Sequence, residues 1–108
     1  MRQKPKKTND NLSSLQTVDK LIHSPARLRI MAHLFVVENA DFLYIMRQTD
    51  LTFGNLSSHL NTLEKAAYVT ISKEFIGKKP HTLIKLTDKG REAFLHYKKN
   101  MQQFFNKL

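Results

Sequence analysis

The spacing of apolar residues changes twice along this chain, and the two changes limit the folds it can adopt. Between residues 25 and 66 apolar side chains recur every three or four positions, the period of an amphipathic helix. From Val69 to Phe75 they alternate with polar residues, as in a half-buried strand. After Thr87 the helical period returns. The pattern predicts a mainly α domain with one small β-hairpin.

Helix boundaries can be placed from the residues that favour helix ends. A helical spacing of apolar residues covers 12–22, and Ser24 and Pro25 then restart the chain as N-cap and first helical residue. The helix that follows, over about 25–37, is apolar over more than half of its circumference, so we expect it to be the central core helix.

The next helices are short. Residues 38–41 end the core helix and begin another, and the apolar segment 41–48 is compatible with a strand or a helix. Thr52 is a good N-cap for a helix over 53–66, with Leu51 and Leu56 at the positions of a hydrophobic staple. The sequence therefore predicts a tight turn between two helices.

The helix predicted over 53–66 carries a narrow stripe of leucines and an unusual opposite face. Apart from one lysine, that face is made of short neutral side chains, not the Glu and Lys that usually cover a solvent-facing helix. Such side chains let a helix approach another surface closely, and they can hydrogen-bond base edges and phosphates. The alternative is an ordinary packed helix with a polar face. The face and its shoulders comprise Gly54, Asn55, Ser57, Ser58, Asn61, Thr62 and Lys65.

The hairpin has a basic tip. We expect strands over 69–75 and 82–86, joined by a turn over 76–81 that contains a glycine and a proline. A two-stranded hairpin is marginal alone and must lean on helices. The cationic or titratable residues on and beside the turn are Lys73, Lys78, Lys79 and His81.

The last helix carries an apolar seam with spacings of three and four residues. Thr87 is its expected N-cap, and Asp88 in the first turn suits the helix dipole. The seam either packs on the N-terminal helix of the same chain or forms a homodimer interface with it, and we favour the dimer. The predicted interface residues are Leu15, Val18, Phe94, Tyr97, Met101, Phe104 and Leu108.

Charge points to a polyanionic partner. The chain has 18 Lys and Arg against 9 Asp and Glu, a formal net charge of +9. Nucleic acid or an anionic membrane surface would attract such a chain. Because no apolar run approaches the ~20 residues of a membrane span, we expect no membrane insertion. Residues 1–11 are basic and almost free of apolar side chains, so we expect a mobile tail before one cytoplasmic domain over 12–108.

The residues for catalysis or metal binding are not arranged as those functions require. There is no cysteine, which excludes thiolate chemistry and cysteine metal sites. The histidines lie on different predicted elements and in no zinc-protease or triad setting, and no glycine-rich phosphate loop is present. We therefore expect no catalytic residue, no metal and no cofactor. The histidines are His23, His33, His59, His81 and His96.

Three segments resemble the MarR/ArsR-type winged helix-turn-helix transcriptional regulators. They read SPARLRIM, LTFGNLSSHLNTLEKAAYV and FIGKKPHTLIKLTDKGREAF, and the resemblance covers about residues 22–97. It implies that 53–66 is the recognition helix, with Thr52, Gly54, Asn55, Ser57 and Ser58 at its DNA-facing N-terminal positions. It also implies that about 75–82 is the wing, where Lys78, Lys79 and His81 would meet phosphates or a minor groove, and that the terminal helices dimerise.

Two residues depart from the pattern of these regulators. Ala67 stands where they usually have glycine, which should weaken a left-handed helix C-cap there. Lys78 and Lys79 stand where two arginines are common, which keeps phosphate binding but loses bidentate readout.

The function expected from this resemblance is sequence-specific binding of double-stranded DNA by a homodimer that regulates transcription. Thr62, Lys65 and Lys73 are further candidate contacts. The alternative is a winged-helix module that binds protein or RNA. RNA recognition usually needs exposed aromatics, and Phe53, the only aromatic near the polar face, is expected to pack under the turn. No polar cluster indicates an effector.

Overall fold

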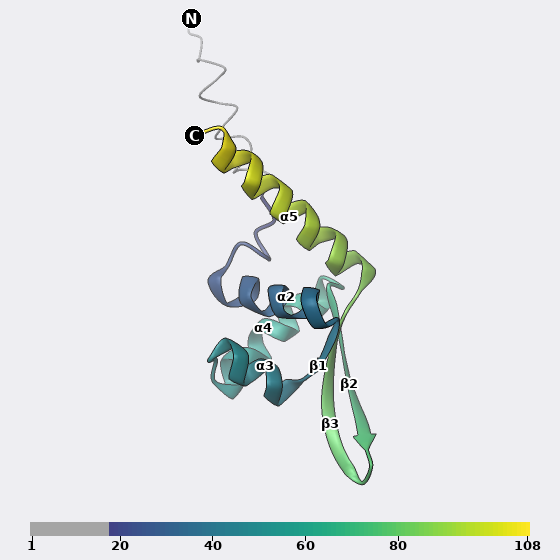
Figure 1. The fold of residues 1–108 in the computed structure, drawn as a ribbon. Helices are drawn as coiled ribbons and strands as arrows, with labels where there is room; N and C mark the ends of the chain where they lie inside the picture. The colour runs from purple at the N-terminus through teal and green to yellow at the C-terminus, as the bar shows by residue number, and fades with distance from the viewer. Residues whose placement is uncertain (1–17) are drawn as a thin grey trace, which may run out of the picture.

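A computed structural model describes residues 18–108, so the basic tail, Leu12 and Leu15 lie outside the described residues. Helices pack around one core, a long last helix projects from one end of the molecule, and a hairpin projects from the other (Figure 1). The architecture is a winged helix, mainly α with a small antiparallel sheet. Its elements are α2 (Pro25–Val37), β1 (Asn39–Asp41), α3 (Phe42–Thr49), α4 (Phe53–Lys65), β2 (Val69–Ile76), β3 (Lys79–Leu86) and α5 (Asp88–Asn106).

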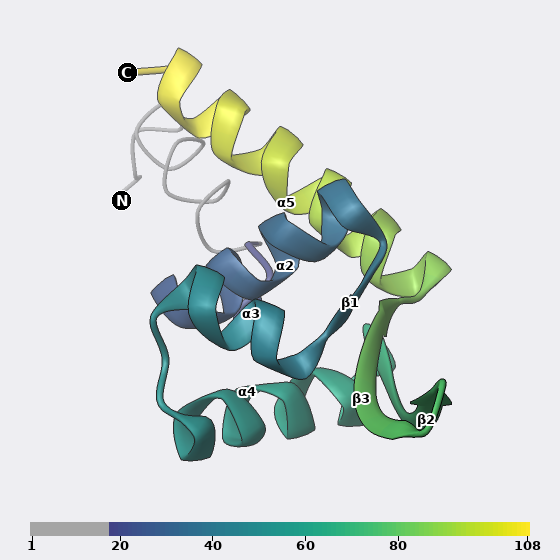
Figure 2. The same cartoon turned by 60° about the horizontal axis from the view of Figure 1, so that its bottom comes forward.

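Helix α2 is the central helix of the core, as its apolar circumference predicted. It lies between α5 on one side and α3 and α4 on the other (Figure 2), and it packs against all three. Its neighbours each turn an apolar stripe towards it. The fully buried side chains of the three inner helices are Ile30, Met31 and Leu34 from α2, Ile45 from α3, and Leu56, Leu60 and Leu63 from α4.

The sheet has three strands in the order β1-β3-β2, one strand more than the sequence predicted. Residues 39–41, expected only to separate two helices, pair antiparallel with β3, and Ala40 lies opposite Ile84. Glu38 makes this possible because its backbone, at φ 70°, turns the chain sharply out of α2. The short strand thus satisfies backbone groups of β3 that a two-stranded hairpin would leave unpaired.

The turn at the hairpin tip is shorter than predicted. Strand pairing continues to Ile76 opposite Lys79, so the connection consists of Gly77 and Lys78 and not of residues 76–81. Gly77 has φ +65°, a conformation that glycine adopts without steric cost. The hairpin is therefore a stiff ladder almost to its end.

The described residues before α2 are not helical. Residues 18–24 form turns, so the helix predicted over 12–22 does not extend to its expected end. The Asp19 carboxylate accepts hydrogen bonds from the N–H groups of Leu21 and Ile22, which closes the turn locally. Ser24 occupies the N-cap of α2 with Pro25 next, but its side chain makes no capping hydrogen bond.

The other two predicted caps are confirmed. Thr52 Oγ1 accepts a hydrogen bond from the Asn55 N–H at 3.1 Å, and Thr87 Oγ1 accepts one from the Gly90 N–H at 2.9 Å. Gly90 also permits a close approach, since a Cβ there would lie 2.1 Å from the Tyr68 carbonyl oxygen. The first turn of α5 is therefore held directly against the chain that leads into the hairpin.

The end of α4 shows a backbone strain that the sequence anticipated. Ala66 is right-handed at φ −82°, whereas Ala67 takes the left-handed conformation at φ 64°. For a residue with a Cβ, that conformation costs about 1–2 kcal/mol of free energy. This conformation is offset by a hydrogen bond, because it lets the Tyr68 N–H donate to the Leu63 carbonyl as the chain turns into β2.

We predict that Ala67→Gly raises the free energy of unfolding by about 0.5–1 kcal/mol, the steric relief less the greater chain entropy of glycine. Urea denaturation would measure the change. Ala66→Gly is the matched control, because the same substitution at a right-handed residue should lower stability. A stabilisation at both positions, or at neither, would contradict the assignment.

Candidate nucleic-acid interface

Helix α4 turns its leucines inward and its small polar residues outward. Gly54, Asn55 and Ser58 are exposed, and Ser57 is half-buried. Thr62 is half-buried and its hydroxyl donates to the Ser58 carbonyl at 3.2 Å, while Lys65 is exposed in the last turn. After Phe53, the exposed face of the helix carries no long side chain until Glu64 and Lys65. It can therefore approach a partner surface closely.

Thr52 has a structural role in this surface. Its side chain is exposed, but its hydroxyl oxygen accepts the Asn55 N–H and so fixes the first turn of α4. The hydroxyl proton remains free to donate outward.

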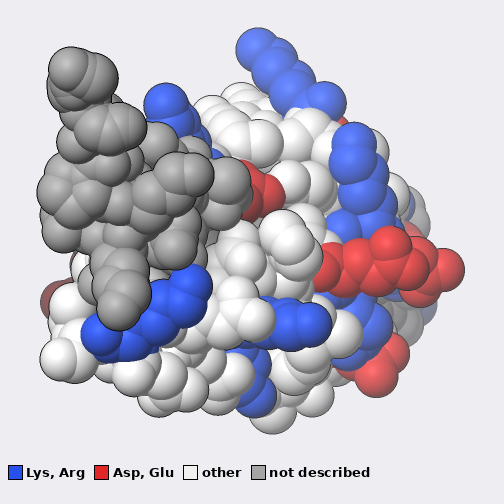
Figure 3. Space-filling view, turned by 90° about the horizontal axis from the view of Figure 1, so that it is seen from above, with Lys and Arg blue, Asp and Glu red and all other residues white. Residues whose placement is uncertain are grey.

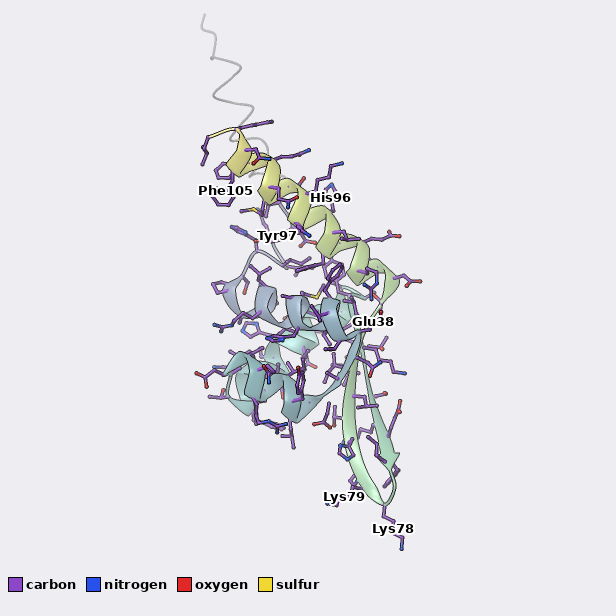
Figure 4. All side chains as sticks on the ribbon, in the orientation of Figure 1. Glu38, Lys78, Lys79, His96, Tyr97 and Phe105 are labelled. Atoms are coloured by element: carbon purple, nitrogen blue, oxygen red, sulfur yellow. The ribbon has the colours of Figure 1, made fainter. Side chains whose placement is uncertain are left out.

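The hairpin carries cations at its tip. Lys78 and Lys79 are exposed and extend from the far end of β2 and β3, away from the helices (Figure 4). Neither forms an ion pair with an acidic side chain of the described residues. Two ammonium groups are thus held on a stiff ladder at a distance from the core.

Lys73 lies closer to α4 than the tip lysines do. The strand register places it opposite Thr82, and both line a cavity of about 240 Å³ between the hairpin and α4. From α4 this cavity receives Ser57 and Asn61. The structure therefore brings two residues of the predicted polar face and one predicted hairpin cation to a single concave surface, here called the inner groove.

His81 is placed differently from the three lysines. Its Nδ1 donates to Asp41 Oδ1 at 2.8 Å, which ties β3 to the start of α3, where the same carboxylate caps the Leu43 N–H. The hydrogen bond from His81 lowers the pKa of Asp41 more than partial burial raises it. His81 therefore links the outer part of the hairpin, where it lies opposite Glu74, to Asp41 at the start of α3, and the charge at the tip comes from the lysines.

Two exposed aromatic side chains border this surface. Phe53, expected to pack under the turn, is 66% exposed and rests on Phe42 with ring centroids 4.9 Å apart. Phe53 is the first residue of α4 and precedes Leu56, the first buried residue of this helix. Phe75, which sequence reasoning did not select as a contact residue, is 75% exposed. The strict alternation of side chains along β2 could have identified Phe75. Its side chain lies on the core-facing side of the strand, but beyond the helices that would cover that side.

The interior side of α4 contains a polar junction with α2. Arg27 Nε donates to the Leu21 carbonyl at 2.6 Å, and its NH1 lies 3.1 Å from His59 Nδ1. Since a guanidinium can only donate, Nδ1 of His59 is the acceptor and the imidazole is neutral. Burial, and then the nearby Arg27 charge, lower the pKa of His59.

The predicted dimer residues divide into two groups. Val18 and Tyr97 are buried within the protomer, where the Tyr97 hydroxyl lies 3.0 Å from His23 Nδ1. Phe94 and Met101 pack against the same core, and Phe94 stacks on Phe35 at 5.0 Å. The first half of the seam thus completes the protomer's own core.

Beyond Met101 the seam reaches the projecting end of α5. Phe104 is half-buried, Phe105 is exposed at the far end of the helix (Figure 4), and Leu108 is 79% exposed. The end of the molecule that carries α5 shows basic side chains interspersed with acidic and uncharged ones (Figure 3). The described cations of this face therefore form no unbroken basic patch.

Over residues 18–108 no three His, Asp or Glu side chains gather as metal ligands would. Within the same range no helix has the length and apolar character needed to cross a bilayer.

Comparison with known proteins gives consistent matches. Residues 26–105 match the family described as winged helix DNA-binding domain. An uncharacterized protein of Methanocaldococcus jannaschii, MJ0432, is 40% identical over 78 residues, which cover 72% of this chain and 85% of that protein. The structure of a transcriptional regulator homologue from Pyrococcus horikoshii OT3 superposes with a TM-score of 0.82 at 30% identity, covering 90% of this chain and 95% of that chain.

A MarR-family transcriptional regulator from Silicibacter pomeroyi shares the fold at lower sequence similarity. Its structure matches with a TM-score of 0.66 at 17% identity, covering 94% of this chain and 68% of that chain.

The Arg27–His59 contact predicts acid sensitivity. Because the pKa of His59 is lowered in the folded protein, the unfolded chain binds the additional proton first, and stability falls as the pH drops below the ordinary histidine value of 6.5. His59→Asn, whose amide oxygen can still accept from Arg27, should lose less stability than the wild type between about pH 7 and pH 5. Urea denaturation at several pH values measures this, and parallel pH profiles would refute it.

Proposed function

This chain belongs to the winged helix DNA-binding domain family, and on that premise we propose that it is a sequence-specific regulator of transcription that binds double-stranded DNA as a homodimer. In this proposal α4 enters the major groove, and the hairpin formed by β2 and β3 is the wing, which contacts the backbone or the adjacent minor groove.

One observation supports this function above the others: Ser57 and Asn61 from the short polar face of α4 and Lys73 from the wing line the same inner groove. The helix is suited to read base edges, since Asn55, Ser57 and Ser58 stand near its N-terminus and carry short side chains that can hydrogen-bond. The wing lysines are suited to bind phosphates, which add affinity without sequence preference. Thr52, Gly54, Thr62 and Lys65 are proposed as supporting contacts.

We propose that the dimer forms through the projecting end of α5, with Phe104 and Leu108 in the interface. These apolar side chains extend past the protomer's core, and two copies could bury them together. A two-fold dimer would present two α4 helices to successive major grooves about one helical turn apart, and would read a pseudo-palindrome.

The family and the fold are those of transcriptional regulators and not of enzymes. The alternative, a winged-helix module for RNA, has one observation in its favour, because Phe53 and Phe75 are exposed. Competition between duplex DNA and single-stranded RNA of the same sequence for the full chain separates the two functions.

We predict strong salt dependence of duplex binding. If a dimer neutralises about six to ten phosphates, its affinity should fall on the order of a thousandfold between roughly 50 and 200 mM salt. Fluorescence anisotropy of a labelled duplex measures this slope. An affinity that does not change with salt would exclude the proposed phosphate contacts.

We also predict that Ser58→Glu abolishes specific binding, because it places a carboxylate against the phosphates and base acceptors of the groove. Ser58 is exposed, so thermal unfolding should be nearly unchanged. Gln103→Glu, which introduces the same charge on exposed α5, is the control and should bind almost as well as the wild type. Specific binding by the Ser58→Glu variant would show that this face of α4 does not enter the groove.

A further inference from the structure

The wing ends in an apolar pair that the core does not use. Phe75 is 75% exposed and lies directly opposite Pro80 in the strand ladder, one pair from the tip. Because cross-strand partners share a face, the pair continues the side of the hairpin that holds Lys73 opposite Thr82 and, farther in, Ile71 opposite the buried Ile84.

This face of the wing is directed towards α4. Thr82 and Lys73 line the inner groove together with Ser57 of α4, and the alternation along the ladder places Pro80 and Phe75 on the same face as this pair. Phe75 therefore lies on the α4 side of the wing, whereas Ile76, its neighbour in sequence, lies on the opposite side with Lys79.

The surroundings of Phe75 indicate the chemistry of its partner. Lys73 precedes it by two residues on the same face and Lys78 follows at the turn, whereas Glu74 and Lys79 lie on the opposite face, so any partner that reaches the ring must be compatible with two ammonium groups. A polyanion with an apolar surface between its charges satisfies both conditions. The deoxyribose walls of a DNA minor groove have this character, since sugars line the groove and phosphates border it.

We infer that Phe75, backed by Pro80, is a non-ionic DNA contact that enters the minor groove beside the major groove occupied by α4 and packs against the deoxyriboses. The sugar-phosphate strand between the two grooves then crosses the inner groove, with Lys73 and Ser57 beside it. This inference rests on the proposed function, and it adds to the wing an affinity that salt does not screen.

Duplex DNA fits this surface better than a single strand. One face of the Phe53 ring is occupied by Phe42, so Phe53 and Phe75 do not form a row of free stacking platforms. The exposed side of α4 that adjoins them has the short side chains of a helix that enters a groove.

The test separates the apolar contact from the ionic ones by salt dependence. The probe is a labelled duplex of about 30 base pairs, enough for two half-sites one turn apart, selected by the full chain from a random pool. Phe75→Ala should weaken binding about tenfold at every salt concentration and leave the slope of log affinity against log salt unchanged. Lys78→Gln should instead reduce that slope.

Ile76→Ala is the matched control. It also truncates an exposed apolar residue at the tip, 57% exposed, but on the face turned away from α4, so its affinity should stay within about twofold of the wild type. Both residues are exposed, and thermal unfolding of each variant confirms that the fold is retained. Hydroxyl-radical footprinting should show that minor-groove deoxyriboses protected by the wild type become accessible in Phe75→Ala.

The possible results distinguish this inference from the function on which it rests. If the wild type selects and binds no duplex, the proposed function fails. If the wild type binds duplex DNA, three results for Phe75→Ala would refute the apolar contact while DNA binding stands. These are an affinity equal to that of the wild type, a changed salt slope, and unchanged protection of the minor-groove deoxyriboses. If Phe75→Ala weakens binding of a single-stranded oligonucleotide but not of the duplex, Phe75 is a stacking platform and the inference is overturned.

Discussion

The burial of three leucines on α4 sets the orientation of this helix and of the surface it exposes. Leu56, Leu60 and Leu63 are almost completely removed from water against α2 and the sheet. Each buried leucine contributes roughly 2 kcal/mol, so only a rotation of α4 that keeps all three inside is stable. That rotation leaves Asn55 and Ser58 outside. The surface offered to a partner is therefore set by the core and not by the polar residues themselves.

The position of the wing relative to α4 depends on one short junction. The Tyr68 carbonyl accepts a hydrogen bond from the Thr87 N–H, the Thr87 hydroxyl donates to the Ala67 carbonyl at 2.6 Å, and Gly90 packs close against the Tyr68 carbonyl. The Tyr68 hydroxyl donates to Asp19, and burial together with this bond raises the pKa of Tyr68 to about 12. Thr87, Gly90 and Asp19 thus all contact the chain between α4 and β2 and hold it in place. The turn itself is made at the cost of backbone strain at Ala67.

The candidate interface divides its chemistry between two elements. Helix α4 is nearly neutral, while the wing carries unpaired lysines at the end of a stiff ladder. Such a division fits a protein that is attracted to a polyanion by charge and selects among sites through hydrogen bonds, because Coulomb attraction to phosphates is the same for every sequence. The exposed Phe75 adds a third component, an apolar one, at the tip.

The local features of this protein follow from short-range patterns in its amino-acid sequence. Thr52 and Thr87 as helix caps, the polar face of α4, the hairpin and the unusual Ala67 were all readable, because caps, periodicity and turn residues act over three or four positions. Three features became visible only in the folded chain: the pairing of β1 with β3, the bond from His81 to Asp41, and the burial of Val18 and Tyr97. These depend on contacts between residues distant in the sequence, and no local pattern encodes which distant partner a strand edge, an imidazole or an apolar seam will meet.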